Sequence, residues 1–121
     1  MNFETLSRWA DEELKALAKV LPDDVQAAAS KVPVSMEEKP GSGAFDTELA
    51  GDELGLFEGP SAMDEADPSE LPRIRLFLTN LWDWTEHDEQ DFRDEVGTTF
   101  LHELGHYLGW DEDEVTERGL E

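Results

Sequence analysis

The segment from Asp88 to Leu108 constrains the fold more than any other part of the chain. Its large apolar residues are spaced by four, which keeps side chains on one face of an α-helix. These residues are Phe92, Val96, Phe100, Leu104 and Leu108. Acidic residues fill the first turn, where the helix dipole favours them, and Gly109 stands where a left-handed residue would end the helix. The spacing therefore predicts one long helix with one apolar face.

Two histidines lie four residues apart in this helix, in the run His102-Glu103-Leu104-Gly105-His106. Residues at this spacing project from the same helical face, so both imidazoles can reach one metal ion. Zinc accepts neutral imidazole nitrogens and tolerates an open position for water. Glu103 would lie beside the metal, where it could take a proton from the zinc-bound water as that water attacks a carbonyl. The pattern predicts a zinc centre, and the alternative is two surface histidines without a metal.

A third protein ligand should be a carboxylate, because the chain has no cysteine and only three histidines. His87 precedes His102 by fifteen residues, which is about 22 Å along a continuous helix at ~1.5 Å per residue. Four acidic residues follow the turn at Gly109, and a sharp turn would swing one of them back over the metal. They are Asp111, Glu112, Asp113 and Glu114. Spacing alone does not choose among them.

The N-terminal part of the chain predicts two further helices. Residues 3–21 carry apolar side chains at three- and four-residue spacing, with Asn2 available as N-cap and Pro22 marking the end. Residues 23–31 predict a shorter helix with acidic residues in its first turn.

Three segments predict strands, because apolar residues alternate in them or form short runs between turn residues. They cover residues 32–40, 54–59 and 73–79. The last of them places Ile74, Leu76 and Leu78 on one face. Stretches with glycine, proline and acidic residues over 39–53 and 60–72 predict loops. Helices and strands together predict an α+β fold in a single domain, residues 1–121.

The charge of the chain excludes two classes of partner. With 31 Asp and Glu against 9 Lys and Arg, the formal charge is −22, which repels nucleic-acid phosphates and anionic membrane surfaces. The N-terminus has no basic and apolar leader, and no apolar run is long enough to span a bilayer, so we expect a cytoplasmic protein. The acidity itself has three explanations: a solvated surface, adaptation to high salt, or a cleft that attracts cationic substrates.

The run from His102 to Glu112 resembles the extended zincin signature, in which His-Glu-x-x-His continues through x-x-Gly-x-x to a third ligand. More narrowly, almost the whole chain resembles the short bacterial zincin-like metallopeptidases, which are minimal matrix-metalloprotease-like domains. The resemblance implies a small mixed sheet packed against an N-terminal helix and a long active-site helix. It also implies a Zn²⁺ cofactor held by His102, His106 and Glu112, with Glu103 as the catalytic base.

Two features depart from that family. It usually has Asp at the position of Glu112, so Asp111 or Asp113 remain alternatives for the third ligand. Longer metzincins also have a methionine-containing turn downstream, and no Met follows His106. The leading prediction is a zinc peptidase acting on a peptide or protein substrate, with basic substrates as one option. The alternatives are a zinc-binding module without turnover and an acidic interaction protein that holds a basic partner.

Other residues near the motif have two interpretations each. Residues 54–59 or 73–79 could form an edge strand that binds peptide by strand addition, and core strands are the alternative. Trp82 and Trp84 could line the cleft, but burial in the core is the favoured interpretation. Tyr107 points about 100° away from its histidine neighbour around the helix.

Overall fold

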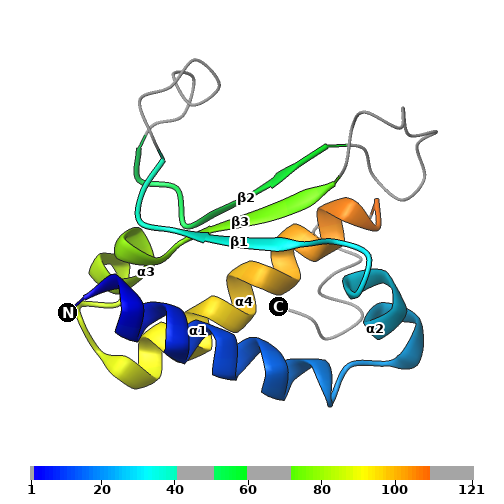
Figure 1. The fold of residues 1–121 in the computed structure, drawn as a ribbon, viewed down its shortest axis with the longest axis horizontal. Coiled ribbons are helices and arrows are strands. Elements are labelled where there is room, and N and C mark those ends of the chain that lie inside the picture. Colours follow the sequence, from blue (N-terminus) through cyan, green and yellow to red (C-terminus); the bar gives the residue numbers. More distant parts are fainter. Residues whose placement is uncertain (1, 41–50, 60–71, 110–121) are drawn as a thin grey trace.

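A computed structural model describes residues 2–40, 51–59 and 72–109 of the chain (Figure 1). Its elements in order are α1 (Phe3–Ala18), α2 (Asp23–Ala29), β1 (Val34–Glu37), β2 (Gly55–Glu58), β3 (Arg73–Phe77), α3 (Leu78–Trp84) and α4 (Glu89–Tyr107). The strands form one mixed sheet in the order β1-β3-β2, with β3 parallel to β1 and antiparallel to β2. The long helices α1 and α4 lie side by side beneath the sheet. The predicted α+β fold is confirmed.

The first helix follows the prediction at its start and ends earlier. The Asn2 side chain accepts a hydrogen bond from the Thr5 amide at 2.8 Å, as expected of an N-cap. The helix stops at Ala18, not at residue 21. Leu21 is nevertheless buried in the core. Its apolar side chain therefore indicated a buried position and not a position within the helix. A residue that precedes a proline, as Leu21 does, is disfavoured in the helical region.

The third strand is shorter than predicted. It ends at Phe77, and Leu78 begins α3, a helix that the alternation of apolar residues did not indicate. Ile74, Leu76 and Leu78 are all fully buried, so the pattern identified core positions correctly. Because β3 buries successive residues on both of its faces, period-two alternation could not mark where the strand stops.

The last helix agrees closely with the prediction. The Asp88 side chain caps it by accepting from the Asp91 amide at 2.9 Å, and Gly109 follows it with a left-handed φ of 78°. The apolar residues at four-residue spacing are buried against α1 and the sheet, except Leu108, which is half-buried. Trp9 of α1 packs its ring edge-on against Phe92 at 6.1 Å. Among the described residues, no helix is long and apolar enough to cross a membrane.

Candidate metal centre

The two motif histidines point toward one another near the end of α4. The Nε2 atoms of His102 and His106 lie 3.2 Å apart, and the rings are nearly perpendicular at 87°. One ligand atom from each of His102, Glu103 and His106 can be chosen so that all lie within 4.8 Å of one another. The predicted cluster on one face of this helix is therefore confirmed.

The spacing of the two imidazoles fits a zinc ion. Tetrahedral coordination with Zn–N bonds of ~2.0–2.1 Å separates two nitrogen ligands by about 3.3 Å, and the observed separation is 3.2 Å. His106 is exposed and His102 is half-buried, so an ion can arrive from solvent. The donor set of two imidazoles and one carboxylate is also one that zinc accepts.

Glu103 is the buried member of the cluster, with 9% of its surface exposed. Burial raises the pKa of its carboxyl group above the ordinary value, because the charged form loses water. The electrostatic influence of His106 and His102 partly opposes that rise, and so does a hydrogen bond from the backbone of Phe57. A carboxylate with a raised pKa is a stronger base than an ordinary one, which favours the removal of a proton from water.

Strand β2 runs along the cluster at the edge of the sheet. The Phe77 amide donates to the Leu54 carbonyl at 3.0 Å, and Gly55 is paired with Leu76. In an antiparallel pair this register turns the backbone groups of Leu54 toward β3 and those of Gly55 and Phe57 outward. Of the two segments considered for the edge position, 54–59 therefore occupies it, and 73–79 contributes the central strand β3.

The edge strand and α4 run in the same direction, and successive contacts between them are separated by similar distances along each element. A Cβ atom on Gly55 would lie only 2.6 Å from the Thr99 Cγ2 atom, and Phe57 contacts Glu103. Two strand residues advance about 6.6 Å, and the four helix residues from Thr99 to Glu103 advance about 6 Å. A cleft of about 270 Å³ lies along this line. Its walls are Leu54, Gly55, Glu95, Thr98, Thr99, His102 and Glu103.

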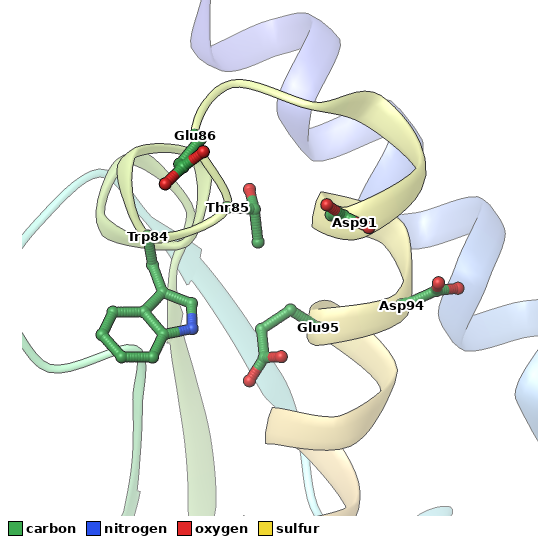
Figure 2. A pocket seen from close by; sticks show the side chains of 6 residues that line it. All are labelled: Trp84, Thr85, Glu86, Asp91, Asp94 and Glu95. Atoms are coloured by element: carbon green, nitrogen blue, oxygen red, sulfur yellow. The ribbon is translucent and has the colours of Figure 1, made fainter.

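Other predicted residues are divided between core and surface. Tyr107 is buried and packs edge-to-face on Phe57 at 5.9 Å, under the edge strand. Trp82 packs against the core. The core interpretation is wrong for Trp84, which is 67% exposed; it lines a second cavity beside α4 (Figure 2). The predicted ligand Glu112 and its alternatives at positions 111, 113 and 114 lie outside the described residues.

His87 is the third histidine, and it lies away from the cluster. Its ring stacks on Trp82 at 5.2 Å and its Nε2 atom lies 2.9 Å from an Asp83 carboxylate oxygen. It is exposed, and its φ of 62° is left-handed, which is uncommon for a residue other than glycine.

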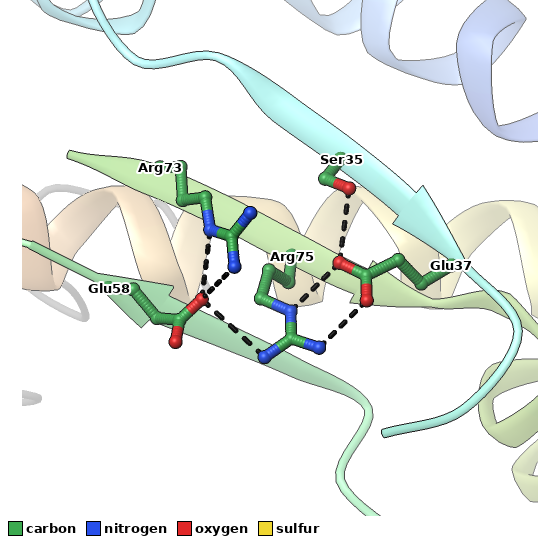
Figure 3. A network of polar contacts seen from close by, with 5 residues as sticks. All are labelled: Ser35, Glu37, Glu58, Arg73 and Arg75. Carbon is green, nitrogen blue, oxygen red and sulfur yellow. Dashed lines mark hydrogen bonds and ion pairs between the residues drawn. The ribbon is translucent and has the colours of Figure 1, made fainter. Parts of the chain in front are cut away.

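Sequence patterns gave no sign of a charged network on the sheet face opposite α4 (Figure 3). Arg75, only 4% exposed, donates twice to Glu37 at 2.7 and 2.8 Å and also contacts Glu58 at 3.5 Å. Arg73 pairs with the same Glu58 carboxylate at 2.8 Å, and the Ser35 hydroxyl donates to Glu37 at 3.0 Å. The network links all three strands. The hydrogen bonds from Arg75 hold the pKa of Glu37 below its ordinary value.

Comparison with protein families matches residues 29–120 to a family described as zincin-like metallopeptidase. The matched range includes all three strands, α3 and α4, and it begins after α1. No curated protein matches the chain.

Proposed function

Because the chain belongs to the zincin-like metallopeptidase family, we propose that it is a zinc-dependent peptidase with Glu103 as general base. In this proposal His102, His106 and a carboxylate after Gly109, Glu112, hold the zinc ion. The observation that carries the proposal is the 3.2 Å separation of the two Nε2 atoms, beside a buried carboxylate that lines an open cleft.

The roles of the side chains follow from their chemistry. A bound zinc ion would polarise the carbonyl of the scissile bond and make water a better nucleophile at neutral pH. The imidazoles of His102 and His106, whose Nε2 atoms face one another, would hold the ion. The carboxylate of Glu103 removes a proton from water and delivers it to the departing amine, which its raised pKa allows. Burial against Phe57 fixes where that carboxylate lies.

The substrate in this proposal is an extended peptide that adds to the free edge of β2. The outward backbone groups of Gly55 and the outward carbonyl of Phe57 would supply main-chain hydrogen bonds, which give affinity without regard to sequence; the Phe57 amide already donates to Glu103. Because the cleft is lined by Gly55 from the edge strand and by His102 and Glu103 from α4, a peptide paired with β2 would pass over Glu103.

A Glu103→Gln variant tests the assignment of the base. We expect it to keep its zinc content and to lose cleavage of a diverse peptide library by roughly 10²–10⁴-fold, the usual contribution of a general base. The matched control is Glu4→Gln, the same change on the exposed surface of α1, and it should leave both properties unchanged. His106→Ala should lose zinc and cleavage together. If the wild type binds zinc stoichiometrically and cleaves no peptide, the chain is a zinc-binding module without turnover.

A pair of variants tests the third ligand. Glu112→Ala should lower zinc affinity by more than the ~10–100-fold typical of losing a partner outside the ligand set. Asp113→Ala should have little effect. Equal and small losses would exclude Glu112 and point to another carboxylate after Gly109.

A further inference from the structure

The cleft at the metal centre continues along α4 toward α3. It shares Glu95 with a second cavity of about 300 Å³, which is lined by Trp84, Thr85, Glu86, Asp91, Asp94 and Glu95 (Figure 2). It shares Leu54 with a third cavity of about 530 Å³ that also reaches Trp84. Glu95 therefore stands where the cleft meets the surface around the exposed indole of Trp84.

Glu95 lies on the same face of α4 as the metal cluster. It precedes His102 by seven residues, which is two helical turns or about 10 Å. An extended peptide advances ~3.3 Å per residue, so this distance corresponds to about three substrate residues. The matching steps of β2 and α4 place Glu95 beside the beginning of the edge strand, near Leu54.

Glu95 differs from the other half-buried carboxylates of the described segments. Glu37, Glu58 and Glu13 each pair with an arginine, and Glu53 accepts a hydrogen bond from the Gly51 amide at 2.8 Å. Glu95 makes neither kind of contact with any described residue. Figure 2 shows its carboxylate on the side of α4 that faces the indole of Trp84, while the carboxylate of Asp94 points away from that indole. A half-buried carboxylate facing an exposed aromatic ring suits a long cationic side chain. The ring would receive the methylene stem and the carboxylate would receive the charge.

We propose that Glu95 and Trp84 form a subsite for a Lys or Arg side chain of the substrate, about three residues from the scissile bond. The proposal rests on the proposed peptidase function and assigns its substrate class. Antiparallel pairing with β2, the more common kind of strand pairing, places this residue on the C-terminal side of the scissile bond. Part of the acidity of the chain then serves to select basic substrates.

Peptide binding to the metal-free protein tests the subsite without catalysis. The probes are end-blocked decapeptides with one Lys moved through each position, and matched peptides with norleucine, measured by isothermal titration calorimetry in chelator at low ionic strength. The Lys peptide should bind about fivefold more tightly at the best position, as expected of a partly exposed ion pair supported by an aromatic ring. Glu95→Gln should remove that preference and Trp84→Ala should reduce it.

The control variant is Asp24→Asn, which removes one charge from α2, at the opposite end of the molecule from α3. It should keep the fivefold preference. An absent Lys preference, or one that survives in Glu95→Gln, overturns the subsite.

Measurements on zinc-loaded protein separate this inference from the function on which it rests. If Lys binding depends on Glu95 but no peptide is cleaved, the subsite stands and the peptidase proposal fails. If peptides are cleaved with a kcat/KM that depends neither on Lys nor on Glu95, the peptidase stands and the subsite is wrong.

Discussion

Replacing Gly55 by alanine tests how closely the edge strand must approach the catalytic helix. The new Cβ atom would lie 2.6 Å from the Thr99 Cγ2 atom and 3.2 Å from the Arg75 carbonyl oxygen. Ordinary carbon–carbon contacts are ~3.5–4.0 Å, so the first contact is too short by about 1 Å. Thr99 is only 8% exposed and cannot turn into solvent. Strand β2 and α4 would have to separate beside the cleft that holds Glu103.

The size of the effect follows from two opposing contributions. Overpacking of a core usually costs about 1–3 kcal/mol. Replacing glycine within a strand recovers roughly 0.5–1 kcal/mol of backbone entropy. We therefore expect Gly55→Ala to lower the free energy of unfolding by about 1–2 kcal/mol. Thr99→Ser removes the obstructing methyl group and should by itself cost about 0.8 kcal/mol, the value of one buried methylene.

Urea denaturation of the metal-free protein, followed by tryptophan fluorescence, measures these values. The double variant should be within about 0.5 kcal/mol of Thr99→Ser alone, because the serine leaves room for the new Cβ atom. Zinc affinity should fall in Gly55→Ala and recover in the double variant. The reasoning is refuted if Gly55→Ala is as stable as the wild type, or if its loss is the same with and without the Thr99 methyl group.

Three further substitutions test other parts of the fold. Arg75 holds the pKa of Glu37 low in the folded protein. The ion pair therefore stabilises the protein at a pH above the pKa that Glu37 has in the unfolded chain, and this stabilisation is lost as the pH falls through the pKa of Glu37 in the folded protein. Glu37→Gln should cost about 2 kcal/mol in urea denaturation at pH 7 and almost nothing near pH 2; equal costs would exclude ionisation as the cause. Gly97→Ala should stabilise by about 1 kcal/mol, since its Cβ would lie 4.0 Å from Leu17, and a lower melting temperature would contradict this. Gly109→Ala should cost about 1 kcal/mol, because φ there is 78°; an unchanged melting temperature would show that this conformation is not required.

The sequence was most informative where a pattern extends over several turns. Helix α4 repeats its apolar spacing over nineteen residues, so its existence and the pairing of His102 with His106 could both be predicted. Helix α3 has seven residues, or about two turns. Over so short a segment, the helical spacing of apolar residues cannot be told clearly from the alternation in the preceding strand.

Contacts between distant segments had no local signal. The approach of Gly55 to Thr99 depends on how β2 lies on α4, and the glycine reads in sequence as an ordinary strand breaker. The exposure of Trp84 and the charged network around Arg75 likewise depend on the packing of separate elements. Glu95 could have been identified, because helical spacing places it on the face of His102; what the sequence lacked was the neighbouring Trp84 surface.

The strand order has a consequence for synthesis on the ribosome. Strands β1 and β2 both pair with β3 and not with each other. Until residues 73–77 have left the exit tunnel, neither earlier strand has its partner. The apolar face of α1 stays uncovered for longer, because α4 follows β3 in the chain. The nascent chain therefore carries two unpaired strands until β3 emerges, and an uncovered helix until α4 emerges. Such segments are prone to association with other chains, and the surplus of negative charge would keep them apart.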